Sequence, residues 1–206
     1  MTGILVLIAA YLIGGIPFGY LLVRWKTGAD VRSVGSGNIG ATNVLRTTGR
    51  AAGVVTLLLD IAKGYLAVWL AGYYLSQCAC WMSVAAVAVM LGHAYPVFLK
   101  FKGGKGVATF VGAFLFLQPV PALATMVVFL AVVAATRYIS LGSILGAAFF
   151  PLGVWLISHA AWPVVVSSAG CGAFVIWRHK DNIARLLAGR ENVFRFGEKR
   201  CSGSVF

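Results

Sequence analysis

VATFVGAFLFLQPVPALATMVVFLAVVAAT, residues 107–136, is the stretch that decides the fold of this chain. It is almost entirely apolar, and it is longer than the roughly 20 residues that one helix needs to span a membrane. Gln118-Pro-Val-Pro121 interrupts it in the middle, and proline either ends a helix or stands in its first turn. The stretch therefore either crosses a membrane once or folds into a hairpin of two short helices.

The positions of lysine and arginine choose between these two folds. All but one of the 17 such residues lie in four short polar segments, and the exception is Lys63. The segments are Arg24–Arg50, Lys100–Lys105, Arg137 and Arg178–Arg200. Basic residues favour the cytoplasmic side of a membrane, and only the hairpin keeps all four segments on one side. We therefore predict an all-α polytopic membrane protein with seven transmembrane helices, its N-terminus outside and its C-terminus inside.

The other spans follow from the remaining apolar runs. These are Ile4–Val23, Ala51–Leu75, Trp81–Leu99, Ile139–Ile157 and Val164–Trp177. The first should be a retained helix, because no basic residue precedes it and no small-residue cleavage site follows it. Gly14, Gly15 and Pro17 should bend it. Residues 1–192 should form one membrane domain, followed by a loose tail over 193–206.

The first helix of the hairpin, Gly106–Leu117, is too short to cross a membrane alone, because it would extend only about 18 Å. We expect it to begin inside the protein with its N-terminus facing a cavity. Short helices of this kind would line an active-site cleft that opens to the cytoplasm.

The overall composition supports a membrane protein. The 206 residues are 60% hydrophobic and 11% charged, with a mean hydropathy of +0.91. The net charge of +12 then reflects membrane orientation and anionic headgroups, and we expect no nucleic-acid partner. The four cysteines lack metal-ligand spacing, since Cys78-Ala-Cys80 is too tight for zinc and has no second pair. We predict no metal and no cofactor.

The first inner segment whose residues could form a binding site is Gly35-Ser-Gly-Asn-Ile-Gly-Ala-Thr-Asn-Val-Leu-Arg46. Glycine lets main-chain N–H groups converge on an anion, and the Ser, Asn and Thr side chains add further donors. Arg46 can hold an anion with two parallel hydrogen bonds. A flexible cytoplasmic loop is the alternative, but the density of donors beside a membrane favours a binding site.

The second inner segment is Phe101-Lys-Gly-Gly-Lys-Gly-Val107. Its glycines surround Lys105 at the start of a helix, as in phosphate-binding loops, although the spacing is not that of a nucleotide-binding motif. A basic turn that only fixes topology would explain Lys100 and Lys102 but not the glycines. His93 precedes this segment, and as a single residue it fits a buried histidine and a site residue equally well.

The third inner segment runs from Trp177 to Glu191, where His179, Asn182 and Arg185 recur every three residues along one helix face. An amphipathic helix on anionic lipid would account for the neighbouring cations Arg178, Lys180 and Arg190, but less well for a His and an Asn in register. Within the second span, Asp60 and Lys63 are spaced to pair with each other, either at the site or as a brace of the bundle.

Together these segments resemble the three motifs of the bacterial acyl-phosphate:glycerol-3-phosphate acyltransferase family. The matching stretches are Gly35–Arg46, Gly92–Thr109 and Arg178–Glu191, and Asp60-x-x-Lys63-Gly64 fits as well. The resemblance implies a seven-helix enzyme of the bacterial inner membrane with its active site on the cytoplasmic side. It implies transfer of a fatty acyl group from acyl phosphate to the 1-hydroxyl of glycerol 3-phosphate, giving lysophosphatidic acid. The implied partners are these two substrates, membrane lipid and the soluble enzyme that produces acyl phosphate.

Site residues follow from the motif positions. The predicted catalytic residues, which would surround glycerol 3-phosphate, are Ser36, Arg46, Lys105, His179 and Asn182. The predicted substrate-binding residues are Gly35, Gly37, Asn38, Thr42, Asn43, His93, Gly103, Gly104, Gly106 and Thr109, and the glycine loop would hold the donor phosphate. The predicted supporting residues are Asp60, Lys63, Arg185 and Glu191. A transporter for small organic phosphates is the rival class, but it would place its anion-binding groups at the bilayer midplane and show repeat symmetry.

Overall fold

The computed structural model describes residues 1–194, and these residues are helical without a strand. Most of the predicted loose tail therefore lies outside the described residues. The α-helices are α1 (Thr2–Gly15), α2 (Phe18–Thr27), α3 (Ala41–Thr48), α4 (Arg50–Tyr74), α5 (Ala79–Ala94), α6 (Val107–Leu117), α7 (Pro119–Thr136), α8 (Ile139–Ser158), α9 (Trp162–Arg178) and α10 (Lys180–Leu187). Two short 3-10 helices, η1 (Val31–Ser33) and η2 (Val97–Leu99), lie in the connections.

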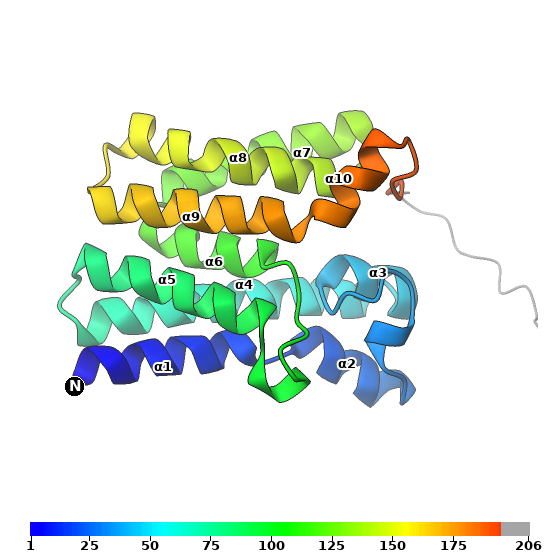
Figure 1. The fold of residues 1–206 in the computed structure, drawn as a ribbon, viewed down its shortest axis with the longest axis horizontal. Helices are drawn as coiled ribbons and strands as arrows, with labels where there is room; N and C mark the ends of the chain where they lie inside the picture. Colours follow the sequence, from blue (N-terminus) through cyan, green and yellow to red (C-terminus); the bar gives the residue numbers. More distant parts are fainter. Residues whose placement is uncertain (195–206) are drawn as a thin grey trace, which may run out of the picture.

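The long helices lie side by side with their axes in nearly the same direction (Figure 1). The N-terminus is at one end of this bundle, and the short helices α3 and α10 are at the other end (Figure 1). Helix α4 packs on α1, α5 and α6, while α8 packs on α7 and α9. The centre of the core is a cluster of three aromatic rings, those of Phe110, Phe114 and Phe150, whose centroids are 4.8–5.0 Å apart.

Small residues let the helices of this bundle approach closely. A side chain at Gly14 of α1 would collide with the main chain of Val89 in α5, and one at Gly112 of α6 would collide with that of Ile61 in α4. Such contacts are typical of membrane helices, which gain no hydrophobic free energy by leaving lipid and therefore associate through close packing. They bring α6 tightly against α4 and so fix the position of the loop that precedes α6.

Two interruptions fall where the sequence predicts them. The first apolar run breaks between Gly15 and Phe18 into α1 and α2, at the residues predicted to bend it. The long stretch Val107–Thr136 forms two helices with Gln118 between them, as the hairpin prediction requires. Helix α6 begins well short of the end of the bundle that carries α3 and α10 (Figure 1).

Five helical segments within residues 1–194 are long and apolar enough to cross a membrane. They are Thr2–Thr27, Arg50–Tyr74, Ala79–Leu99, Pro119–Thr136 and Ile139–Ser158. Helices α6 and α9 are shorter, with 11 and 17 residues. The crossing count of seven and the orientation of the bundle therefore remain predictions.

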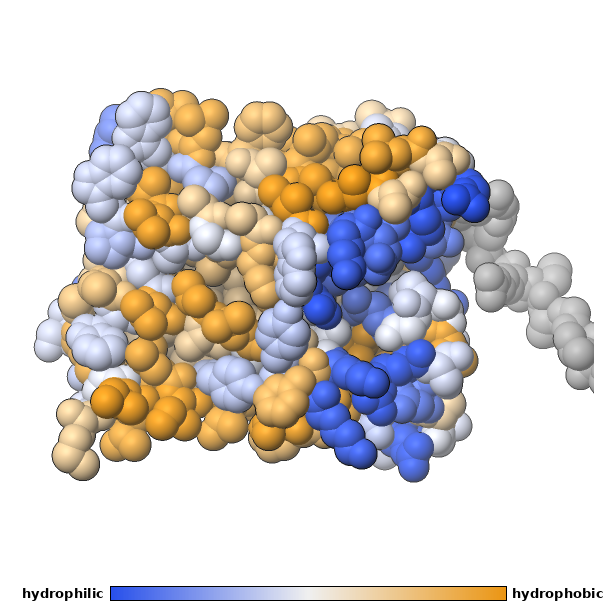
Figure 2. Space-filling view, viewed as in Figure 1, coloured by the Kyte–Doolittle hydropathy of each residue, from blue (hydrophilic) through white to orange (hydrophobic). Residues whose placement is uncertain are grey.

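The surface is divided between an apolar flank and a polar end. In Figure 2 hydrophobic residues cover most of the visible face, while hydrophilic residues gather at the end formed by α2, α3 and α10. This division matches the sequence pattern, in which all but one of the basic residues lie in four short polar segments.

Candidate active site

Two adjoining cavities open toward the polar end of the bundle. The larger, about 470 Å³, is lined mainly by apolar side chains of α4, α6, α7 and α8. The smaller, about 450 Å³, is lined mainly by polar groups from the connections and from α10. Six residues line both, which makes their meeting point the natural place for a reaction between an apolar and a polar molecule. These are Ser36, Asn38, Lys105, Asn182, Arg185 and Asn192.

The first glycine-rich segment is held together from inside by Asn43, whose side chain is buried. The Asn43 Oδ1 atom accepts a hydrogen bond from the Ser36 main-chain N–H at 2.8 Å. Gly35 and Gly37 have φ angles of +62° and +68°, a conformation that favours glycine. The Asn43 Nδ2 group donates to three main-chain oxygens of the segment, those of Val31 (3.2 Å), Val34 (3.1 Å) and Asn38 (2.9 Å).

This scaffold assigns different tasks to the predicted residues of the first segment. Asn43 is predicted from the motif to bind substrate, but its amide is occupied by the loop itself, so it positions its neighbours. Ser36, Asn38, Thr42 and Arg46 line the larger cavity and carry side-chain donors that could reach an anion there.

The second segment uses its glycines differently from the prediction. The N–H groups of Gly103 and Gly104 donate to the carbonyls of Ala94 (3.0 Å) and His93 (3.1 Å) at the end of α5. They are therefore not available to an anion. The physical reason is that the last carbonyls of a helix have no partner within it and need donors from elsewhere.

The N-terminus of α6 retains the capacity for anion binding that the sequence predicts. Gly106 precedes α6 with a φ of +86°, and the first helical hydrogen bond runs from the Phe110 N–H to the Gly106 carbonyl at 2.7 Å. The main-chain N–H groups of the first turn come before that bond and have no acceptor within the helix. Gly106 and Val107 line the larger cavity, next to Lys105. The site thus combines the positive end of a helix with an ammonium group.

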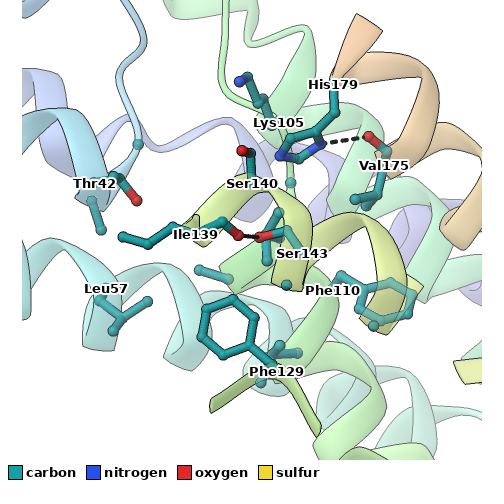
Figure 3. Close-up of a pocket in the computed structure, with 18 of the residues that line it drawn as sticks. Thr42, Leu57, Lys105, Phe110, Phe129, Ile139, Ser140, Ser143, Val175 and His179 are labelled. Carbon is teal, nitrogen blue, oxygen red and sulfur yellow. Dashed lines mark hydrogen bonds between the residues drawn. The ribbon is translucent and has the colours of Figure 1, made fainter. Parts of the chain in front are cut away.

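The third segment presents His179 and Asn182 toward Lys105. The His179 Nδ1 atom lies 2.7 Å from the Val175 carbonyl (Figure 3). A carbonyl can only accept, so Nδ1 carries the hydrogen and Nε2 keeps a lone pair. Lys105 donates a hydrogen bond to the Asn182 side-chain oxygen. Figure 3 shows the His179 ring, Lys105 and Ser140 in the same part of the larger cavity.

The Glu191 carboxylate holds this segment in place through three hydrogen bonds. Its carboxylate accepts hydrogen bonds from Asn182 (2.7 Å), Arg185 (2.8 Å) and Ser140 (3.0 Å). Burial by itself would raise the pKa of Glu191, but the three hydrogen bonds outweigh it and the pKa is lowered. The carboxylate is therefore ionised at neutral pH and fixes the face of Asn182 that Lys105 meets.

Burial also lowers the pKa values of Lys105 and His179, which lie near the meeting point of the cavities. It lowers the pKa of Lys105 to about 8, and the nearby Arg185 cation contributes in the same direction. It lowers the pKa of His179 to about 4, so that the imidazole is neutral at pH 7. Burial lowers the pKa of Arg46 as well. The site is thus cationic through Lys105 and the arginines, with a neutral imidazole beside them.

Asp60 and Lys63 form the predicted pair inside the bundle. The Lys63 ammonium lies 2.7 Å from the Asp60 carboxylate and donates to the Ile16 carbonyl at 2.9 Å, at the break between α1 and α2. His93 Nδ1 lies 3.7 Å from the same carboxylate. Lys63 thus supplies the donor that the broken helix lacks, which favours the bracing role. Asp60 and His93 also line the larger cavity.

The structure brings together most of the residues predicted from sequence. Besides the shared residues above, the larger cavity is lined by Thr42, Arg46, His93, Gly106, His179 and Glu191, and the smaller by Gly35, Gly37 and Gly103. Gly104, Thr109 and Lys63 line neither cavity. Thr109 is fully buried, and its main chain packs on Gly64 at the contact between α6 and α4.

Sequence reasoning missed several polar residues of the site, among them Asn192, which lines both cavities. Ser140 and Ser143 line the larger cavity from the first two turns of α8 (Figure 3). Their spacing of three in an apolar helix is a signal that could have found them. Arg178, which the lipid-helix interpretation assigned to the membrane surface, instead donates hydrogen bonds to the carbonyls of Gly103 and Gly104. Among residues 1–194, no three His, Cys, Asp or Glu side chains cluster in a way that could hold a metal ion.

Comparison with known proteins gives consistent matches over the whole described bundle. Residues 4–189 match the family model described as "Glycerol-3-phosphate acyltransferase". A protein of that name from Desulforamulus reducens is 45% identical over 200 residues, which cover 97% of this chain and 98% of the relative. Another from Geobacter sulfurreducens is 47% identical over 187 residues, covering 90% of this chain and 94% of the relative.

Solved structures agree with the fold. The crystal structure of PlsY (YgiH), an integral membrane glycerol 3-phosphate acyltransferase, matches in its glycerol 3-phosphate form with a TM-score of 0.90 at 39% identity. That match covers 95% of this chain and 96% of that chain. The lysophosphatidic acid form of the same protein matches with a TM-score of 0.87 at 37% identity, with the same coverage.

Proposed function

The chain belongs to the glycerol-3-phosphate acyltransferase family, and we propose that it transfers a fatty acyl group from an acyl phosphate to the 1-hydroxyl of glycerol 3-phosphate. The products are lysophosphatidic acid and inorganic phosphate. As an integral membrane acyltransferase of phospholipid synthesis, it needs a site that admits both a lipid chain and a small anion.

The meeting of the two cavities at Lys105 is the observation that carries this proposal. The apolar cavity offers a place for the acyl chain among side chains such as Leu57, Phe110 and Phe129 (Figure 3). The polar cavity offers a place for glycerol 3-phosphate, which is small, hydrophilic and anionic. The acyl carbonyl and the hydroxyl would then meet beside Lys105, His179 and Asn182.

The reaction requires the protein mainly to position the two substrates and to stabilise developing negative charge. An acyl phosphate is a mixed anhydride whose phosphate is a good leaving group. The hydroxyl oxygen forms a bond to the acyl carbonyl carbon, and the bond from that carbon to the phosphate oxygen breaks. Lys105 and Arg46 stabilise the negative charge that develops, and the helix N-terminus of α6 adds to this field.

The hydroxyl proton has two possible acceptors. One is the leaving phosphate, and the other is the Nε2 lone pair of His179, whose Nδ1 is held by Val175. The neutral state of His179 at pH 7 is consistent with the second route. Neither route needs a covalent intermediate with the protein.

Charge distribution supports a location in the bacterial inner membrane with the site facing the cytoplasm. Helices α2 and α10, whose sequences include Arg24, Lys26 and Lys180, extend to the polar end of the bundle. Basic residues favour the cytoplasmic side. Glycerol 3-phosphate and the soluble enzyme that produces acyl phosphate would approach from that side, and the product would leave into the lipid.

The test is acyl transfer by the purified protein in detergent, with acyl phosphate or acyl-CoA as donor and radiolabelled glycerol 3-phosphate as acceptor. We expect labelled lysophosphatidic acid and equimolar phosphate from acyl phosphate alone, with no loss of rate in excess EDTA. Robust turnover with acyl-CoA alone, or activity lost in EDTA and restored by Mg²⁺, would contradict the mechanism. In a parallel assay with the protein reconstituted into lipid vesicles, uptake of label without lipid formation would instead support the transporter class.

A further inference from the structure

We propose that Arg178 is a positioning residue that fixes the glycine loop, Gly103 and Gly104, and thereby sets Lys105 and the start of α6 against His179 and Asn182. The proposal deepens the proposed function and rests on it for its kinetic consequences. It assigns to Arg178 a role inside the protein in place of a contact with lipid.

The guanidinium of Arg178 holds both carbonyls of the glycine loop. Its terminal nitrogen Nη2 donates to the Gly103 carbonyl at 3.1 Å and to the Gly104 carbonyl at 2.9 Å. Its Nε donates to the Gly104 carbonyl at 3.2 Å. This arrangement uses the planar fork of arginine, which a lysine ammonium cannot reproduce.

The opposite edge of the same loop is held by α5. Because the Gly103 and Gly104 N–H groups donate to the last carbonyls of α5, both peptides have a partner on each side. The loop has no side chains of its own with which to pack, so these hydrogen bonds determine its position. Without Arg178, the α5 bonds would remain but the link from the loop to α9 would be lost.

A side chain within the loop could not replace the contacts of Arg178, because neither Gly103 nor Gly104 has room for one. A side chain at Gly103 would collide with the His93 carbonyl and the ring of Pro96, and one at Gly104 would collide with the His93 imidazole. The loop therefore packs closely on the end of α5, and the carbonyls of Gly103 and Gly104 accept hydrogen bonds from Arg178.

The Arg178 side chain is itself preorganised. It is half-buried, and its guanidinium lies over the Tyr95 ring at 5.5 Å from the centroid. The Tyr95 carbonyl accepts a hydrogen bond from the Tyr11 hydroxyl at 2.6 Å, which ties this position to α1. An arginine held in this way loses little further freedom when it binds the loop.

The position of Arg178 in the chain gives the contact a functional consequence. Arg178 is the last residue of α9, and His179 follows it directly. The loop that it holds leads directly into Lys105 and α6. One side chain therefore couples the segment that carries the imidazole to the segment that carries the ammonium, and a shift of about 1 Å between reacting groups can cost on the order of a hundredfold in rate.

The experiment compares Arg178→Ala, Arg178→Lys and the control Lys102→Ala. Lys102 is an exposed cation of the same connection, so its variant removes the same charge without touching the loop carbonyls. For each purified variant we would measure kcat and KM for both substrates, the melting temperature, and hydrogen exchange of the Gly103 and Gly104 amides without substrate.

We expect kcat/KM to fall roughly 10- to 100-fold in Arg178→Ala, with a drop in kcat for both substrates and a higher KM for the one whose phosphate binds at Lys105 and the start of α6. Arg178→Lys should recover part of the loss. Methylguanidinium added to Arg178→Ala should restore several-fold activity, whereas urea, its neutral analogue, should not. Exchange of the two glycine amides should be faster in both Arg178 variants than in Lys102→Ala.

Arg178 variants that match Lys102→Ala in kinetics and in hydrogen exchange would overturn the proposal. If Arg178→Ala does not fold, Arg178→Lys gives the same comparison with the cation retained. If the wild-type protein shows no acyl transfer, the proposed function fails, but the exchange measurement still decides whether Arg178 fixes the loop.

Discussion

Lys105 and Asn182, 77 positions apart in the sequence, are joined side chain to side chain by a hydrogen bond across the meeting point of the two cavities. Lys105 stands between the glycine loop and α6, and Asn182 stands on α10, where Glu191 fixes its amide. The contact closes the polar end of the site from two sides. It also holds Lys105, which lines both cavities, where the proposed function would place a phosphate.

We expect Lys105→Ala and Arg46→Ala each to lower kcat/KM by roughly 10²- to 10³-fold, or about 3–4 kcal/mol of transition-state stabilisation. Both cations line the larger cavity, and under the proposed mechanism they stabilise the charge that develops there. Lys102→Ala is the matched control and should retain most activity. Equal losses at Lys102 and Lys105, with unchanged melting temperatures, would show that bulk positive charge matters and a defined site does not.

The alkaline side of the pH profile should depend on Lys105. Its pKa is lowered to about 8, so the ammonium is charged below pH 8 and neutral above it. We expect kcat/KM to fall as pH rises through about 8, after correction for hydrolysis of the donor. Lys105→Arg should move this limb to higher pH, because guanidinium stays charged. A wild-type profile that is flat to pH 10 would contradict the role of the charged lysine.

The acidic side of the profile should not show the ordinary titration of histidine. Burial lowers the pKa of His179 to about 4, so the imidazole is already neutral at pH 6 and becomes charged only as pH falls through about 4. NMR of ¹⁵N-labelled histidine in the purified protein should therefore show the neutral tautomer of His179, with its hydrogen on Nδ1, between pH 5.5 and 8. A midpoint near 6.5 would be inconsistent with a buried ring.

The Asp60–Lys63 pair should be a brace whose halves depend on each other. Lys63→Met leaves the Asp60 carboxylate buried without its cation and removes the donor to the Ile16 carbonyl. We expect destabilisation of about 3–5 kcal/mol, seen as a lower melting temperature in detergent. The double variant Asp60→Asn, Lys63→Met should recover part of the loss. Lys26→Met, which removes an exposed cation of α2, should change stability little.

The glycine loop should not tolerate a side chain at Gly104. Its Cβ would collide with the imidazole of His93, so Gly104→Ala must displace either the loop or His93. We expect at least a tenfold loss of kcat/KM. Gly170→Ala is the control, because nothing lies within 4 Å of a Cβ at that helical position. Similar behaviour of the two variants would mean that the loop adapts easily.

The seven-span topology predicts that the exposed residues Cys78 and Cys80 face the periplasm. An impermeant maleimide added to intact spheroplasts should label them. In a variant without native cysteines, Gln118→Cys and Ser158→Cys should be labelled from the same side, and Lys102→Cys only after the membrane is opened. Labelling of Gln118→Cys or Ser158→Cys only from the cytoplasmic side would contradict the hairpin.

The sequence by itself determined the parts of this protein that depend on local pattern. Apolar runs predicted the long helices, and Gln118-Pro-Val-Pro121 predicted the division of Val107–Thr136 into α6 and α7. The i,i+3 spacing of Asp60 and Lys63 predicted their ion pair. Hydrophobic periodicity, proline and helix spacing act over a few residues, so they can be read without the fold.

The roles of individual polar groups within the motifs were decided only by the tertiary structure. The motif composition suggested that Gly103, Gly104 and Asn43 face an anion, but their donors are occupied by α5 and by the first loop. By its sequence context Arg178 resembles a surface cation, but at the end of α9 its guanidinium binds the carbonyls of the glycine loop. Whether a donor is free for a ligand depends on which distant carbonyl needs it, and that is known only when the helices are packed.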